Sequence, residues 1–150
     1  MRKAIYAGSF DPFTLGHLEI LKKAVNLFDH VDLLVASNPN KKHILKSSVR
    51  EKLIEESIKD LNADSVTISC LDSSETVAYK AQELDVKYLV RGMRGHTDID
   101  GEMVGARMNK EINEELETIL FVPDVNLENL SSSLVRSMIG LRGWGEMLET

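Results

Sequence analysis

Short apolar runs alternate with segments of helical periodicity along most of this sequence. The runs predicted to be strands cover residues 3–7, 31–36, 66–71, 87–90 and 118–122. Between them apolar residues recur three or four positions apart, which is typical of helices that bury one face. Strands that alternate with helices form a parallel sheet covered on both sides. The sequence therefore predicts an α/β fold: one Rossmann-like domain over residues 1–150, with a five-stranded parallel sheet and helices on both faces.

The helices are expected over about residues 15–28, 47–61, 76–84, 98–113 and 131–139. Their starts carry hydroxyl side chains that can accept hydrogen bonds from unpaired backbone N–H groups. Thr14 is the predicted cap of the first helix, and Ser47 or Ser48 that of the second. The buried face of the second helix is expected to consist of Val49, Leu53, Ile54, Ile58 and Leu61.

Composition narrows the class of protein. At 150 residues and 43% hydrophobic residues, the chain has the size of one domain with a proper core. The net charge of -6 argues against a general nucleic-acid surface, and no run approaches the ~20 apolar residues of a membrane span. Neither nucleic acid nor a membrane is therefore an expected partner. The lone Cys70 excludes a disulfide framework, is expected in the core, and suits a cytoplasmic location.

Residues 8–17, with the sequence GSFDPFTLGH, form the most informative motif. They describe a tight turn from the first strand into the first helix. A helix start favours an anion, and His17 would lie in the first helical turn, pointing at it. The spacing fits neither a dinucleotide fingerprint nor a P-loop. A tight turn with a surface histidine is the ordinary alternative, but the motif favours an enzyme that handles nucleotides.

Polar residues follow each predicted strand, and parallel strands end at one edge of the sheet. Ligands bind at that edge, near the point where the strand order reverses. The sequence therefore predicts that five groups converge there: residues 9–17, Lys41, Thr76, Arg91 and Ser131. Arg91 and Arg94 have the forked guanidinium that suits phosphate, and Gly92 would permit close backbone approach. Taken alone, these arginines could instead pair with Asp98 or Asp100.

Three of these features keep ordinary alternatives. Residues 131–133 could be a plain helix cap or could hold a phosphate group. Lys41 and Lys42 could be solvated, or one of them could reach into the cleft. Glu102 could belong to a solvated helix face or could contact a ribose or a cation.

The 8–17 motif strongly resembles the signature of the nucleotidyltransferase superfamily. Its Thr14-x-Gly16-His17 form is similar to the branch of bacterial phosphopantetheine adenylyltransferases, since many other relatives have histidine in place of Thr14. The likeness continues, in the same order, through residues 37–42, 88–94, 102–109 and 131–135. It therefore spans nearly the whole chain.

This resemblance implies transfer of AMP from ATP to 4'-phosphopantetheine, with magnesium, in coenzyme A biosynthesis. The attack is direct and in line, and the products are dephospho-coenzyme A and pyrophosphate. His17 would be the catalytic residue, because it would stabilise the charge on the α-phosphate. Members of the family are typically hexamers, so a homo-oligomer is implied.

The resemblance also assigns binding residues by position, and none of them is a metal ligand. The phosphopantetheine residues would be Ser9, Lys41, Arg91, Thr76 and Val77. The ATP residues would be Ser9, Phe10, His17, Gly92, Met93, Arg94, Glu102, Leu127, Glu128, Asn129, Leu130, Ser131, Ser132 and Ser133.

Some positions depart from the family pattern, and two alternatives stay open. Ser9 replaces a commoner threonine, Gly101 stands where a tyrosine is expected, and Leu130 replaces isoleucine. The first alternative is another superfamily member, either a mononucleotide adenylyltransferase of NAD synthesis or a cytidylyltransferase. Thr14 and the sequence of residues 91–94 tell against both. The second is a non-catalytic nucleotide-binding module, which would not need His17.

Overall fold

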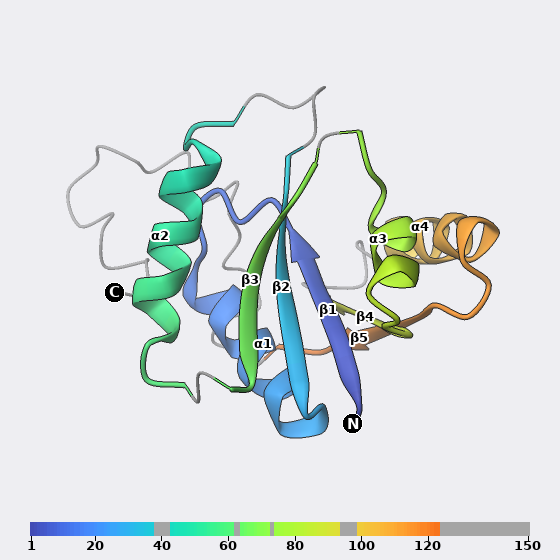
Figure 1. Cartoon of the computed structure of the whole chain (residues 1–150), viewed down its shortest axis with the longest axis horizontal. Helices are drawn as coiled ribbons and strands as arrows, with labels where there is room; N and C mark the ends of the chain where they lie inside the picture. The colour runs from blue at the N-terminus through green and yellow to red at the C-terminus, as the bar shows by residue number, and fades with distance from the viewer. Residues whose placement is uncertain (38–42, 62–63, 73, 94–98, 124–150) are drawn as a thin grey trace.

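The computed structural model describes residues 1–37, 43–61, 64–72, 74–93 and 99–123 (Figure 1). Its strands are β1 (Lys3–Gly8), β2 (His30–Ala36), β3 (Val66–Leu71), β4 (Tyr88–Gly92) and β5 (Glu117–Phe121). Its helices are α1 (Leu15–Leu27), α2 (Ser47–Ile58), α3 (Val77–Glu83) and α4 (Ile99–Ile112). The helix expected over residues 131–139 lies outside the described residues.

The five strands form one parallel sheet in the order β3-β2-β1-β4-β5, which confirms the predicted fold class. The chain moves outward from β1 through β2 to β3, then crosses back to β4 on the other side of β1. The strand order therefore reverses between β1 and β4. In Figure 1 all carboxyl ends of β1, β2 and β3 point to the upper edge, where the loop after β1 begins.

The central strands are buried on both faces. Ala4 and Tyr6 of β1 face the core shared with α1 and α2, whereas Ile5 and Ala7 face the core that contains α3. This alternation follows from the two-residue period of a strand. Figure 1 shows α1 and α2 on one side of the sheet and α3 and α4 on the other. Within the described residues, no helix is long and apolar enough to cross a bilayer.

Helix α2 turns most of its predicted face inward, since Ile54 is buried and Ile58 and Leu61 pack against the core, but Val49 is not part of that face. Its buried residues are Arg50, Ile54 and Ser57, while Val49 is 42% exposed. The N-cap is Lys46, which makes no side-chain capping bond, so neither Ser47 nor Ser48 caps the helix. Arg50 and Ser57 can be buried because they donate hydrogen bonds to backbone carbonyls. The Ser57 hydroxyl, for example, donates to Leu53 O at 2.7 Å.

Cys70 is exposed, so the prediction that it belongs to the core was wrong. The reason is that β3 is an edge strand, which leaves part of its surface uncovered. Partial desolvation raises the pKa of the Cys70 thiol, and the carboxylate of Glu51 raises it further. The thiol therefore stays protonated at neutral pH and is a poor nucleophile.

Gly92 closes β4 against helix α1. A Cβ placed there would lie 2.8 Å from Cγ1 of Ile20, which is itself only 4% exposed. Packing against α1 thus requires a glycine at this position, independently of any ligand that approaches the backbone.

We predict that Gly92→Ala lowers the free energy of unfolding by about 1–3 kcal/mol, because the new methyl group overpacks a filled site. Gly105→Ala is the matched control, since a Cβ at Gly105 in α4 meets nothing within 4 Å. It should leave stability unchanged or raise it by up to about 1 kcal/mol, as alanine favours helix. Urea unfolding at one protein concentration measures both. Equal values for the two variants would contradict the steric account.

Candidate active site

The candidate site lies at the carboxyl ends of β1 and β4, where the strand order reverses. Open α/β sheets bind ligands at this position. The turn that leads to α1 follows β1, and Arg91 is near the end of β4. Arg91 Nη1 donates a hydrogen bond to Ala7 O at 2.8 Å, so its side chain reaches the end of the neighbouring strand. The turn after β1 and Arg91 therefore lie at the same edge of the sheet.

Thr14 and His17 cap each other at the start of α1. His17 N donates to Thr14 Oγ1 at 3.4 Å, and Thr14 N donates to His17 Nδ1 at 3.0 Å. Since Nδ1 accepts a backbone N–H, the hydrogen of the neutral ring is on Nε2. Nε2 is thus the nitrogen that can donate to an anion. The predicted Thr14 cap is confirmed; the return bond to the ring was not foreseen, although the i, i+3 spacing of a capping box signals it.

Two aromatic rings hold the imidazole of His17 in place. Phe13 stacks on it with centroids 5.5 Å apart, and Phe10 meets it edge-on at 5.1 Å. Phe10 and Phe13 are 2% and 1% exposed, so neither ring has room to move. The ring of Phe10 therefore packs inside the core, so the predicted contact of Phe10 with ATP would have to involve its backbone.

Glu102 of α4 orients the guanidinium of Arg91. Its Oε1 lies 3.0 Å from Nη2, and its Oε2 lies 3.1 Å from Nε. The sequence suggested Asp98, Asp100 or solvent as the partner of Arg91. The structure pairs Arg91 with Glu102 and not with Asp100, and Asp98 is outside the described residues. The Arg91 side chain is 39% exposed, so solvent screens the pair and its contribution to stability is small. A phosphate at Arg91 would meet a guanidinium that Glu102 and Ala7 already hold.

Tyr6 lies beneath the site, with its ring 5.2 Å from that of Phe10. Burial raises the pKa of its phenol far above the usual range; the charge of Arg91 opposes this shift and that of Glu102 adds to it. The phenol therefore remains protonated at physiological pH. Tyr6 is not available as a general base.

The remaining predicted residues fall into two groups. Among the described ones, Ser9 is half-buried in the turn after β1, and Met93 N donates to Phe121 O at 3.0 Å. Thr76 follows β3 and caps α3, because its Oγ1 accepts from Tyr79 N at 3.2 Å; Val77 packs against the core. The others, namely Lys41, Arg94 and residues 127–133, are outside the described residues.

Two buried charged residues beside the site were missed. Asp11 is 1% exposed and Arg50 is 2% exposed. Asp11 was visible in the 8–17 motif, but nothing in the sequence indicated which groups it binds. Arg50 lies in a helix rich in Lys and Glu, a pattern typical of a solvated surface.

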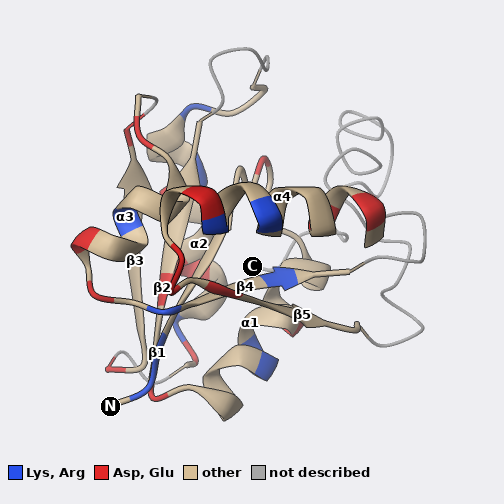
Figure 2. Ribbon diagram, turned by 90° about the vertical axis from the view of Figure 1, so that its right-hand side faces the viewer, with Lys and Arg blue, Asp and Glu red and all other residues tan. Residues whose placement is uncertain are grey.

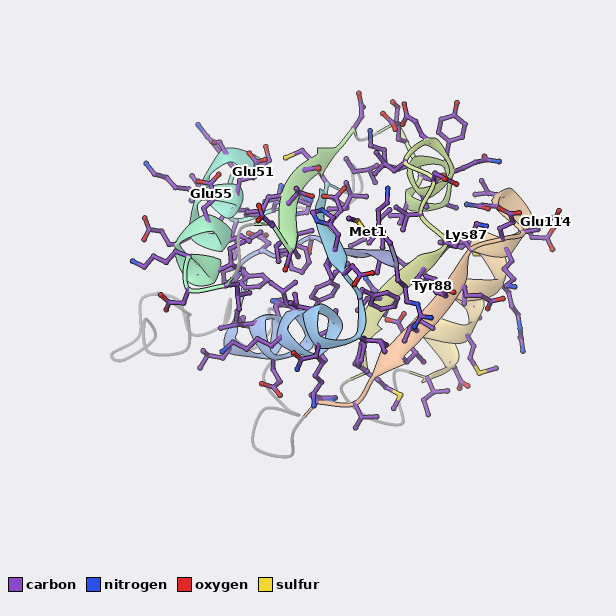
Figure 3. All side chains as sticks on the ribbon, turned by 60° about the horizontal axis from the view of Figure 1, so that its bottom comes forward. Met1, Glu51, Glu55, Lys87, Tyr88 and Glu114 are labelled. Atoms are coloured by element: carbon purple, nitrogen blue, oxygen red, sulfur yellow. The ribbon has the colours of Figure 1, made fainter. Side chains whose placement is uncertain are left out.

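A shallow hollow of about 560 Å³ lies elsewhere on the molecule. It is lined by Met1, Arg2, Leu27, Asp29 and Tyr88, at the amino ends of β1 and β4. Figure 3 labels Met1 and Tyr88, which lie close together there. His17 and Arg91 are at the opposite end of these strands. The hollow is therefore separate from the candidate site.

The strand order of the parallel sheet reverses beside a helix-capping histidine and an arginine, and this is a position where α/β enzymes bind nucleotides. The profile of the Cytidylyltransferase-like family matches residues 5–138, so the chain belongs to this family of nucleotidyltransferases.

Curated relatives narrow the family further. The phosphopantetheine adenylyltransferase of Thermotoga neapolitana is 39% identical over 135 residues, which cover 90% of this chain and 81% of the relative. That of Coprothermobacter proteolyticus is 38% identical over 140 residues, which cover 93% and 84%. The chain is therefore an enzyme of the phosphopantetheine adenylyltransferase group.

Solved structures show the same fold at lower identity. Nicotinic acid mononucleotide adenylyltransferase of Plasmodium falciparum, complexed with NaAD, aligns with a TM-score of 0.70 at 18% identity, over 94% of this chain and 85% of that one. A putative nicotinate-nucleotide adenylyltransferase of Vibrio parahaemolyticus aligns with a TM-score of 0.63 at 23% identity, over 93% and 82%. A bifunctional Francisella tularensis enzyme, complexed with AMP and a manganese ion, gives 0.62 at 19%, over 91% and 40%.

A pair of Thr14 variants tests the reciprocal cap. Thr14→Val keeps the volume but loses the hydroxyl, and should cost about 0.5–2 kcal/mol of stability and lower turnover. Thr14→Ser keeps the hydroxyl and loses the methyl group, so it should retain more turnover. Thermal unfolding and steady-state rates measure these effects. A valine variant as active as the serine variant would show that the Thr14 hydroxyl does not support His17, since both variants keep the backbone bond to Nδ1.

Proposed function

We propose that this enzyme transfers AMP from ATP to 4'-phosphopantetheine, giving dephospho-coenzyme A and pyrophosphate. The observation that carries the proposal is the imidazole of His17, held with its hydrogen on Nε2 at the helix start that follows β1, while Arg91 is oriented near the end of the neighbouring strand β4. The names of relatives at 37–39% identity support the choice of acceptor.

In this reaction a phosphate oxygen of phosphopantetheine attacks the α-phosphorus of ATP. The new O–P bond forms as the bond from that phosphorus to the bridging oxygen breaks, and pyrophosphate leaves with the electron pair. A phosphate is already an anionic nucleophile, so no covalent intermediate or strong base is required, and protonated Tyr6 supplies none. Catalysis then rests on alignment and on stabilisation of negative charge.

Each polar group has a role in this scheme. His17 Nε2–H would donate to a non-bridging oxygen of the α-phosphate, where the start of α1 adds a partial positive charge. Arg91, with Ser9 and Lys41, would hold the phosphate of phosphopantetheine, and Thr76 and Val77 would lie beside its pantetheine arm. ATP would lie along the other predicted residues: Phe10, Gly92, Met93, Arg94, Glu102 and residues 127–133.

Magnesium is proposed as the cofactor, carried on the phosphates of ATP. The described residues contain no group of three His, Cys, Asp or Glu side chains that could hold a metal ion. They offer no protein ligand set, so no step is assigned to the ion. Mg²⁺ commonly keeps water and substrate phosphate as ligands, which suits this arrangement. We further propose the cytoplasm as the location, which the single free Cys70 supports.

Pyrophosphate release with three acceptors tests the proposed reaction. With ATP, 4'-phosphopantetheine should give turnover far above nicotinate mononucleotide or glycerol phosphate, and CTP should not replace ATP. Faster turnover on either other acceptor would identify a different member of the family. Calorimetric binding of ATP without turnover on any acceptor would identify a non-catalytic module.

Two alanine variants separate the predicted roles. His17→Ala should lower kcat by ~10²–10³-fold with little change in ATP affinity, because it removes a donor that acts in the transition state. Arg91→Ala should mainly raise KM for phosphopantetheine, because it removes a ground-state contact. Near-normal kcat in the first variant, or unchanged KM in the second, would remove the residue from its assigned role.

We also propose that the chain forms a homo-oligomer, a hexamer by family resemblance. Helix α4 has no buried residue among those described, although its apolar side chains recur on one face. Val104, Met108 and Ile112, spaced four residues apart, are 53%, 63% and 48% exposed. In Figure 2 this helix lies on the outside of the molecule beyond β4 and β5, with uncharged stretches between its charged residues. A second copy of the chain would cover this stripe.

Light scattering after size exclusion tests the oligomer. The parent should elute at six times the chain mass of 16.8 kDa. Met108→Glu should lower the mass, because it puts a charge into the proposed interface. Val49→Glu is the matched control, since Val49 is an exposed apolar residue of α2, and it should not change the mass. A monomeric parent, or equal masses for the two variants, would contradict the proposal.

A further inference from the structure

Phe10 adopts a backbone conformation that is unusual for its residue type. Its φ is 47°, in the left-handed region that side chains other than glycine seldom occupy. Such conformations persist where surrounding contacts determine them, and they gather at functional sites. The ring of Phe10 is the one that meets the imidazole of His17 edge-on at 5.1 Å. The backbone of Phe10 thus bears directly on how His17 is held.

Arg50 anchors the residue that precedes Phe10. Its Nη1 donates to Ser9 O at 2.7 Å and to Ala36 O at 3.3 Å, and its Nη2 donates to Ser37 Oγ at 2.9 Å. None of these partners is charged. Burial of a guanidinium costs free energy unless its donors are bonded, so these three oxygens stabilise the buried position of Arg50. One arginine therefore ties the start of the turn to the end of β2.

Asp11, the residue that follows Phe10, is anchored by its own side chain. Its Oδ2 accepts from Ile44 N and its Oδ1 accepts from Leu45 N, each at 2.9 Å. His43 Nδ1 lies 3.5 Å from the same Oδ2. A carboxylate that receives two backbone N–H groups makes strong, charge-assisted bonds. Both anchors thus connect the turn after β1 to the segment 43–50, one from each direction.

We propose that Arg50 and Asp11 are positioning residues for His17. Together they fix Ser9 and Asp11, the residues on either side of Phe10. The backbone of Phe10 is thereby held in the left-handed conformation, which places its ring against the imidazole. Their hydrogen bonds are to the protein, so their effect on His17 is exerted through Phe10. This inference rests on the proposed function for its kinetic consequence, but the placement of the ring is a property of the enzyme alone.

Arg50→Met tests the anchor, and Lys52→Met is the matched control, since Lys52 is exposed on the same helix. Arg50→Met should lower kcat by about 10- to 100-fold, the usual effect of a small misplacement, with a much smaller change in KM for ATP. Arg50→Lys should recover part of kcat, because one ammonium can still reach Ser9 O. Lys52→Met should match the parent. Unchanged kcat in folded Arg50→Met would overturn the proposal.

A double-mutant cycle shows whether Arg50 acts through Phe10. If it does, Arg50→Met combined with Phe10→Leu should be no slower than the worse single variant. Fully additive losses in log kcat would mean that Arg50 acts by another route and would overturn the proposal. If Arg50→Met does not fold, Asp11→Asn takes its place in the cycle, because it keeps the side-chain shape but loses one acceptor.

An NMR measurement without substrate separates this inference from the proposed function. The ring resonances of His17, assigned by their loss in His17→Gln, report both the tautomer and the nearby aromatic rings. Arg50→Met and Asp11→Asn should move these resonances, and Lys52→Met should not. Unmoved resonances in both variants would overturn the positioning role, even if phosphopantetheine proves to be the acceptor. Moved resonances would support it, even if the acceptor is another compound.

Discussion

The hydrogen bond from Thr14 N–H to Nδ1 of His17 is the constraint on which the rest of the site depends. It determines that Nε2 carries the hydrogen of the neutral ring, so the imidazole presents a donor rather than an acceptor. The bond exists only because β1 delivers the turn at the point where α1 begins. The phenylalanine rings then leave the imidazole one orientation. The capping motif thus leaves the Nε2–H of His17 as a donor that suits a phosphate oxygen.

The sheet brings the charged side chain of Arg91 to the same edge. β4 crosses to the far side of β1, and this crossover sets Arg91 beside Ala7 although 84 positions separate them in the chain. Glu102 from α4 and the carbonyl of Ala7 then orient the guanidinium. The donor His17 comes from α1 and the cation Arg91 from β4, and neither needs a titrating base to act on a phosphate. The arrangement agrees with a reaction that depends on alignment and charge.

Much of the fold could be predicted because it depends on local patterns. The predicted β3 matches the structure, β1 and β2 are each one residue longer than predicted at one end, and β5 is shifted by one residue. Apolar runs between turn signals mark buried strands. The cap at Thr14 followed from the same kind of local signal. The extent of the domain and the roles of Lys41, Arg94 and residues 127–133 stay predictions.

The sequence could not show contacts whose partners are far away in the chain. The apolar residues of α2 indicated most of its buried face, but they could not show that Arg50 is buried, because its partners Ser9 and Ser37 belong to other segments. The partner of Arg91 was sought among the nearest carboxylates, whereas helix geometry brings Glu102 to it. Cys70 was expected inside because its strand is apolar, and only the strand order shows that β3 is an edge.

A crystal structure of the enzyme with an ATP analogue and 4'-phosphopantetheine would test the central claim most directly. The account predicts that a non-bridging α-phosphate oxygen lies about 2.7–3.2 Å from Nε2 of His17, with Nδ1 still bonded to Thr14 N and the acceptor phosphate on Arg91. A nucleotide bound away from the carboxyl ends of β1 and β4, or an imidazole turned so that Nδ1 faces the phosphate, would contradict it.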